Sequence, residues 1–189
     1  LPGFIPLRDQ TELVSGKVTA EITTASDAEG HRVQGTIRSE AIHARASGRT
    51  VVIDPAAAIV SLRVDASGTL KADGCQLSSV FGSARLDGDL SSGRATADLD
   101  LGRLAAMLDP LVELPDVSLG GVATGQVQWA ARSGDTWQLQ GDGNATDLTI
   151  SWGDGLQLHR PNLAVQVDAS GRWGGAALRE LTAAEISLR

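Results

Sequence analysis

The sequence predicts a mainly β protein, an antiparallel, curved or sandwich-like meander built from two tandem β units with one short linking helix. Three observations lead to this prediction. Apolar and polar residues alternate with a period of two along most of the chain. Turn-forming stretches rich in Gly, Ser and Asp separate the alternating runs. Short blocks of sequence recur in the same order in the two halves.

The alternating runs place the predicted strands. In the first run, Val18, Ala20 and Ile22 lie on one side and the polar residues between them on the other. The runs cover residues 14–23, 33–38, 59–66, 83–90, 95–101, 125–132, 137–141, 147–152, 156–159, 163–169 and 184–188. Turn signals lie between them at 27–30, 47–48, 67–68, 91–93, 133–135, 153–155 and 170–171. Short strands joined by such turns are typical of a meander.

One segment has the period of an amphipathic helix. Apolar residues follow the i, i+3, i+4, i+7 spacing at Leu101, Leu104, Ala105, Leu108 and Leu111 or Val112. Asp100 is placed to cap the start of this helix, and Pro110 and Pro115 are placed to end it. We therefore expect one short helix at 101–109, at the junction between two β units.

The internal repeat defines the predicted units. Residues 15–18 match 124–127 at an offset of 109, and residues 32–35 match 138–141 at an offset of 106. Val64–Gly68 is identical to Val167–Gly171 at an offset of 103, so the two copies are expected at equivalent strand ends. We predict a first unit at 12–114, which includes the helix, and a truncated second unit at 115–189. Residues 1–11 are predicted to end a preceding unit, and further units are expected outside this sequence.

The composition suits a β protein with thin layers. Leu, Val, Ile and Ala supply nearly all of the apolar content, beside two Phe, no Tyr and four Trp. The net charge of −7 and the lack of a Lys/Arg cluster argue against nucleic-acid binding, which needs a basic face. The only cysteine, Cys75, excludes an intramolecular disulfide and is expected to be a small buried apolar side chain.

The sequence predicts no catalytic or metal site, and hence no enzyme and no cofactor. His31, His43 and His159 are far apart, and none has a Cys, His or carboxylate at metal-ligand spacing. The sequence also lacks a nucleophile elbow, a phosphate-binding loop and a dinucleotide-binding fingerprint.

Two groups of side chains could still bind a ligand. The carboxylates Asp87, Asp89, Asp98 and Asp100 alternate with apolar neighbours and could form a cation site or an acid/base pair. A hydrated polar face is the favoured interpretation, because like charges on adjacent strands repel. All four tryptophans lie in the second unit and could form a platform for sugars or lipid, at positions 129, 137, 152 and 173. Trp129 aligns with Ala20 and Trp173 with Leu70, which favours ordinary packing.

The stretch at 97–108, followed by strands with Gly-x-Val and by the strand at 162–168, resembles the AsmA-like and TamB-like repetitive β proteins of bacterial envelopes. The resemblance is one of style across the whole chain. It implies an inner-membrane anchor, a long curved sheet in the periplasm, an apolar concave groove, and a role in outer-membrane homeostasis and phospholipid movement. No apolar run approaches the roughly 18 residues of a membrane-spanning helix, so the anchor is expected only outside this segment.

Two classes of function follow from these observations. The first is a non-catalytic repeat segment of a large envelope protein, a lipid-conducting or outer-membrane-homeostasis scaffold with phospholipid or other envelope proteins as partners. Its expected apolar groove is lined by Val18, Ile22, Val127, Trp129, Val165 and Val167. The second is a β module that binds carbohydrate or another protein through the Trp residues and the Asp and Gln side chains of the strands. The sequence leaves open whether the apolar face is an open groove or a closed core.

Overall fold

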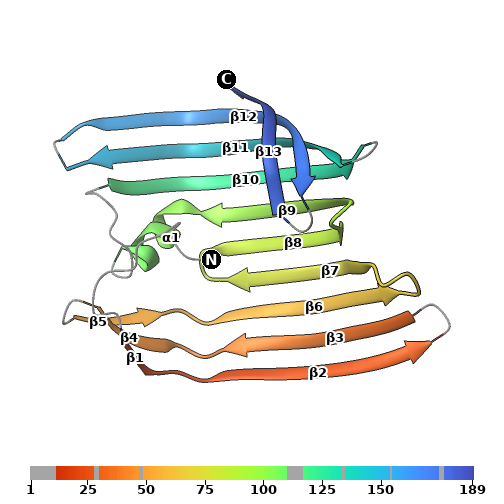
Figure 1. The fold of residues 1–189 in the computed structure, drawn as a ribbon. Coiled ribbons are helices and arrows are strands. Elements are labelled where there is room, and N and C mark those ends of the chain that lie inside the picture. Colours follow the sequence, from red (N-terminus) through yellow and green to blue (C-terminus); the bar gives the residue numbers. More distant parts are fainter. Residues whose placement is uncertain are drawn as a thin grey trace.

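The computed structural model describes residues 12–27, 30–46, 49–109, 117–132, 135–153, 155–174 and 177–189. Within these residues the chain forms thirteen strands and one short helix, and every strand pairs antiparallel with its neighbours (Figure 1). The predicted antiparallel meander is therefore confirmed. Residues 1–11, which were predicted to end a preceding unit, lie outside the described part of the chain.

Ten strands form the main sheet in the order β13-β12-β11-β10-β9-β8-β7-β6-β3-β2, and three form a smaller sheet in the order β1-β4-β5. The strands of the main sheet are β2 (Val18–Asp27), β3 (Gly30–Ser39), β6 (Ala56–Asp65), β7 (Leu70–Ser79), β8 (Gly82–Asp89), β9 (Ser92–Asp100), β10 (Val117–Ala131), β11 (Thr136–Trp152), β12 (Gln157–Gly174) and β13 (Ala177–Leu188). The smaller sheet contains β1 (Glu12–Ser15), β4 (Ile42–Ala46) and β5 (Arg49–Ile53).

The two sheets are parts of one meander that bends. The pair Leu13–Ala44 of β1 and β4 lies in register with the pair Val18–Ser39 of β2 and β3. The strand β2 is therefore a continuation of β1, and β4 is a continuation of β3. The β4–β5 pairs continue the register of β3 and β6 in the same way. Three long strands are thus each interrupted once, at residues 16–17, 40–41 and 54–55. Pro55 has no N–H to donate to a ladder, which accounts for the break before β6.

A similar line of irregularities crosses the second half without dividing the sheet. The register of β10 and β11 shifts between Gly120 and Val122, where Gly121 has φ +105°. Asp147 in β11 has φ +52°, and the β12 residue that falls opposite it in the ladder is Pro161. Gly121, Asp147 and Pro161 follow Gly16, Ala41 and Pro55 by 105, 106 and 106 residues. This spacing favours the two predicted units, whose division at 114 and 115 stays a prediction.

The prediction that the two identical pentapeptides lie at equivalent strand ends is wrong. Asp65 at the end of β6 accepts hydrogen bonds from the amides of Ser67 and Thr69, both at 2.9 Å, and closes the β6–β7 turn. The second copy lies inside β12, where Asp168 accepts a hydrogen bond from Gln140 Nε2 at 3.0 Å. Pairing with β11 and β13 on both sides holds this copy extended, so the neighbouring strands override the local turn preference.

Several strand boundaries differ from the sequence prediction. The run at 14–23 is divided into β1 and β2. The runs at 137–141 and 147–152 are one strand, β11, and those at 156–159 and 163–169 are one strand, β12. In β11 the apolar face between the two runs carries only Gly143 and Ala145, which give a weak apolar signal. The sequence did not predict β4, β5 or β7.

The helix α1 (Leu101–Leu108) follows β9 directly and contacts β10, and the structure describes no other helix. The side chain of Asp100 accepts a hydrogen bond from the backbone N–H of Arg103 at 2.9 Å, which confirms the predicted cap. The amide of Asp109 donates to the carbonyl of Ala105 at 2.8 Å and closes the last turn. Pro110 and Pro115 lie outside the described residues.

Replacement of the cap, Asp100→Ala, should lower the free energy of unfolding by about 1 kcal/mol, because the amide of Arg103 loses its acceptor. Urea unfolding followed by circular dichroism measures this change. The Asp100→Asn variant is the control, since its side-chain oxygen can still accept the bond. Equal destabilisation in both variants would argue against a capping role.

The bend in β10 offers a matched pair of glycine substitutions. A Cβ at Gly121 would lie 2.7 Å from the carbonyl oxygen of Thr146, and the positive φ would be strained for alanine, so Gly121→Ala should cost about 1–3 kcal/mol. At Gly120 the nearest atom to a new Cβ is Thr149 Cβ at 3.7 Å, an ordinary contact. Gly120→Ala should therefore leave the unfolding midpoint nearly unchanged. A tolerated Gly121→Ala would mean that the bend is not fixed by this residue.

Candidate functional site

One face of the main sheet is apolar from edge to edge. The pairing registers connect one residue of each of the ten strands into a row across the sheet that contains no polar side chain. From β2 to β13 the row is Ala20, Ile37, Ala58, Leu77, Ala84, Ala97, Gly125, Gly143, Val165 and Leu188. A second row, from β8 to β13, is Leu86, Ala95, Val127, Gly141, Val167 and Ile186. The pairing register thus places the apolar residues of neighbouring strands side by side, and together they form a continuous apolar surface.

The apolar face forms a groove of about 630 Å³. Its lining runs from Ala58 and Val60 on β6, through Leu77 and Leu86, to Val165 and Val167 on β12. Seven flat strands would spread these ends about 29 Å apart at the usual spacing of ~4.8 Å. The lining residues come from all seven of these strands, so the groove runs across the sheet rather than along one strand. In Figure 1 the C-terminal half of β12 turns out of line, and β13 crosses in front of the neighbouring strands.

The groove is open to solvent along much of its length. Leu77 is 45% exposed and Leu86 is 41% exposed, although both lie on interior strands of the sheet. Near the sheet edges the exposure rises to 63% at Ile22 and 67% at Ile186. No described side chain is fully buried. In the part of the chain that the structure describes, the apolar face is thus an exposed surface.

The structure brings three of the six predicted groove residues together. Val127, Val165 and Val167 line the groove. Val18 and Ile22 lie on the same face but on the edge strand β2, outside the groove, where they are 62% and 63% exposed. Sequence analysis missed much of the lining, namely Ala58, Val60, Cys75, Leu77, Ala84, Leu86, Ala95, Ala97 and Leu139. The alternation of Ala with polar residues along β8 and β9 was the available signal.

Trp129 lies on the apolar face but serves to fix the β8–β9 turn. Its Nε1 donates a hydrogen bond to the carbonyl of Asp89 at 2.7 Å. Its ring lies over Gly93, where an added Cβ would come within 2.1 Å of Cζ2. The indole therefore holds the end of the β9–β10 pair together rather than lining the groove.

The described tryptophans do not form a row. Trp137 is buried near the start of β11, whereas Trp152 ends the same strand and is 41% exposed. The side chain of Trp173 lies outside the described part. Trp129 and Trp137 lie at diagonal positions on the same face of β10 and β11, but Trp137 is buried and Trp152 lies at the far end of β11. The three described indoles therefore do not make the exposed platform that a sugar-binding site would need.

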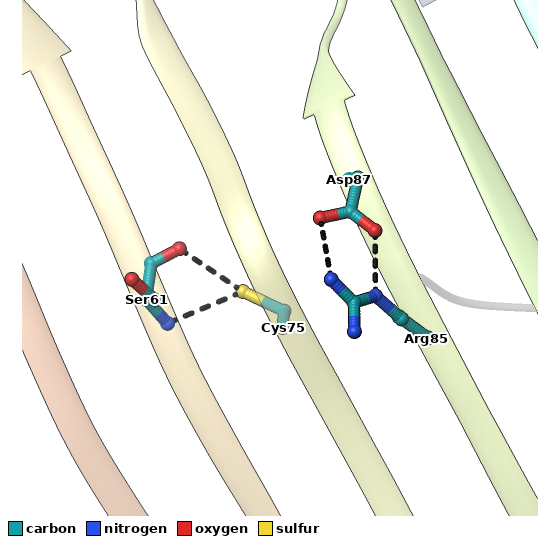
Figure 2. Close-up of polar contacts among 4 residues, drawn as sticks. All are labelled: Ser61, Cys75, Arg85 and Asp87. Carbon is teal, nitrogen blue, oxygen red and sulfur yellow. Dashed lines mark hydrogen bonds and ion pairs between the residues drawn. The ribbon is translucent and has the colours of Figure 1, made fainter.

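Three of the four alternating carboxylates have separate local partners. Asp87 forms a two-pronged ion pair with Arg85, whose Nε lies 2.8 Å from Oδ2 (Figure 2). Asp89 accepts from the amides of Ser91 and Ser92 in the β8–β9 turn, at 2.7 and 2.8 Å, and Asp100 caps α1. Asp98 pairs in the ladder with Ser83 and Thr124. Among the described residues, no group of three or more His, Cys, Asp or Glu could hold a metal ion.

The polar face of the second half carries a network of hydrogen bonds. Arg94 donates to Gln126, and Gln126 Nε2 donates to Asp142 Oδ1 at 2.8 Å. Gln140 and Asp168 form a further pair on the neighbouring strands. The amides of Gln126 and Gln140 and the carboxylates of Asp142 and Asp168, which a carbohydrate ligand could have used, are therefore engaged with one another in these pairs.

Cys75 is half-buried and lines the groove beside the apolar rows. Its Sγ lies 3.3 Å from the carbonyl oxygen of Ser61 and 3.4 Å from the amide nitrogen of the same residue (Figure 2). Ser26 Oγ contacts His31 Nδ1 at 2.8 Å and Thr149 Oγ1 contacts His159 Nδ1 at 3.4 Å, while His43 lies in the smaller sheet. The structure does not gather the three histidines.

The carboxylate of the β8–β9 turn gives a pH prediction. The hydrogen bond from the Ser91 hydroxyl, followed by those from the backbone amides, holds the pKa of Asp89 below its ordinary value. The unfolded chain then binds more protons than the folded chain as the pH falls below about 4, so acid should destabilise the fold in this range. Asp89→Asn should flatten the dependence of the unfolding free energy on pH there, and Ser91→Ala should do so partly. An unchanged slope in Asp89→Asn would contradict this assignment.

Compared with models of protein families, with curated proteins and with solved structures, the chain matches none of them. None of the described helices has the length and apolar character needed to cross a membrane. The apolar face and its groove are therefore the features from which a function can be inferred.

Proposed function

We propose that this chain is a non-catalytic segment of a bacterial envelope protein and that its apolar groove holds the acyl chains of phospholipids. The observation that supports this function best is the apolar row that crosses all ten strands from Ala20 to Leu188. Soluble monomers rarely leave a continuous apolar surface of this kind uncovered, and such surfaces mark contacts with other apolar matter.

The shape of the groove suits a chain-like apolar ligand. Its volume of about 630 Å³ falls within the usual range for ligand sites. Its lining comes from seven strands and is mostly Leu, Val, Ala and Gly, beside Ile59, Cys75 and the polar residues Gln76, Arg85, Thr96, Gln126 and Asp142. The charged side chains on these strands belong to the opposite face, as Arg85 and Asp87 do on β8. An acyl chain would gain about 0.8 kcal/mol for each methylene removed from water, or roughly 8 kcal/mol for ten, before the cost of ordering it. A charged headgroup would stay in solvent at the open side.

The setting proposed for this function is the periplasm or cell envelope, with a membrane-anchored parent protein and a role in lipid conduction or outer-membrane homeostasis. This setting rests on the resemblance to the AsmA-like and TamB-like proteins. The carbohydrate-binding alternative has less support, because the described indoles form no exposed platform, and because Gln126 bonds to Asp142 and Gln140 bonds to Asp168.

The proposal is tested by phospholipid retention. Protein purified from a lipid-rich bacterial host should carry phospholipid that native mass spectrometry detects. Val127→Asp and Val165→Asp should each reduce the lipid-bound fraction at least tenfold, because each places a charge in the groove lining. Gln128→Asp and Gln166→Asp are matched controls, since they add the same charge one residue further along the same strands, on the opposite face.

Thermal unfolding of all four variants shows whether the sheet is intact. Lipid retention by folded Val127→Asp and Val165→Asp would place the lipid elsewhere. A wild-type protein that carries no phospholipid, and takes up none from phosphatidylethanolamine and phosphatidylglycerol vesicles, would overturn the proposal.

A further inference from the structure

We infer that Gly125 and Gly143 keep the floor of the groove low, so that the acyl chain lies across the strands over these two residues. The inference rests on the proposed function, and it adds the path of the ligand and the residues that fit it. Binding then depends on the shape of the floor. A larger apolar side chain at either glycine should weaken binding, although it adds apolar surface.

The smallest side chains of the groove follow the row that runs from Ala20 to Leu188. On four adjacent strands, β8 to β11, this row carries Ala84, Ala97, Gly125 and Gly143, which all line the groove. The larger Leu77 on β7 and Val165 on β12 end this stretch. At the usual strand spacing of ~4.8 Å, the four strands form a low path about 14 Å long across the sheet.

A chain that lay along one strand would meet an obstacle. Leu86 follows Ala84 on β8, and Val127 follows Gly125 on β10, each two residues further along the same face. Along β11 the small residues continue from Gly143 to Ala145, but Ala145 is buried and closed to a ligand. The path across the strands is therefore the one that fits an extended acyl chain.

The backbone does not require glycine at these two positions. Neither residue has a positive φ, in contrast to Gly121 on the same strand. A Cβ at Gly125 would lie 3.2 Å from the carbonyl oxygen of Asp142, and a Cβ at Gly143 would lie 3.2 Å from that of Thr124. The neighbouring strand would need to move by only a few tenths of an ångström to accept either Cβ.

Glycine inside a strand weakens the strand, and it often marks a bulge or the close approach of another backbone or a ligand. Gly125 and Gly143 face each other, and their ladders run without a register shift on both sides, so neither marks a bulge. Among the described atoms, those within 4 Å of a Cβ built at either glycine belong to the paired strand alone. Above them lies the groove, which leaves the close approach of a ligand as the reason for both glycines.

Leucine at the two glycines tests the fit. Each methylene removed from water is worth about a factor of four in affinity, so a leucine that keeps about two methylenes off the floor should lower the affinity about tenfold. Gly125→Leu and Gly143→Leu should each show this loss in uptake from limiting phosphatidylethanolamine and phosphatidylglycerol vesicles, measured by native mass spectrometry. Ala20→Leu is the matched control, because it adds apolar bulk to the same row on β2, outside the groove, and should bind as the wild type does.

Thermal unfolding shows whether the leucine variants are folded. Folded leucine variants that take up as much lipid as the wild type, or more, would mean that apolar area governs binding, and they would overturn the inference. The proposed function would still stand in that case if Val127→Asp and Val165→Asp lose the lipid. A wild-type protein that takes up no lipid would overturn both.

Photo-cross-linking of the wild-type protein tests the path of the chain without a substitution. The probes are two phosphatidylglycerols, with a diazirine at the middle or at the end of one acyl chain, and peptide mass spectrometry identifies the labelled residues. The two probes should label the row from Leu77 to Val165 on different strands. Labels along a single strand, centred on another row, or absent from the groove would overturn the inference.

Discussion

The architecture depends on the register of the antiparallel ladders. Because side chains alternate with a period of two, a slip of one residue in any ladder would move a whole strand's apolar side chains to the polar face. The registers instead keep Ala58, Leu77 and Ala84 in line on successive strands, and they do so across the whole sheet. Among the residues whose burial the structure describes, only seven apolar ones are buried, and these include Ala72, Trp137 and Leu148. Backbone pairing and cross-strand contacts therefore hold the described part of the chain together more than a compact core does.

Irregularities in the strands are compatible with this constraint because each is compensated locally. In β7 the register shifts between Ala72 and Cys75, so the apolar positions change from even to odd numbers along the chain. Ala72 pairs with Gly88 and Cys75 pairs with Leu86, and both partners stay on the apolar face of β8. The extra residue is absorbed at the bulge, and the apolar rows continue past it.

The same features decide what could be predicted from the sequence. The strand β8 keeps a strict alternation and was predicted, and the cap at Asp100 was predicted because it depends on local chemistry alone. The strand β7 was missed because its bulge interrupts the alternation, and the middle of β11 because Gly143 and Ala145 give only a weak apolar signal. The sequence prediction put the second copy of the pentapeptide at a strand end. A five-residue pattern does not show that pairing with β11 and β13 on both sides keeps the chain extended at Asp168.

The candidate site was only half predicted for a related reason. Val127, Val165 and Val167 were predicted as groove residues because they are large and apolar, but the space they border comes from their small neighbours. Gly125, Gly141 and Gly143 occupy positions in the apolar rows where larger side chains would fill the concave surface, and alanines on β8 and β9 act in the same way. The groove is therefore a property of residue size as well as of sheet curvature. A pattern that records only apolar and polar positions reveals the face, but the distribution of small and large side chains along each row determines where that face is hollow.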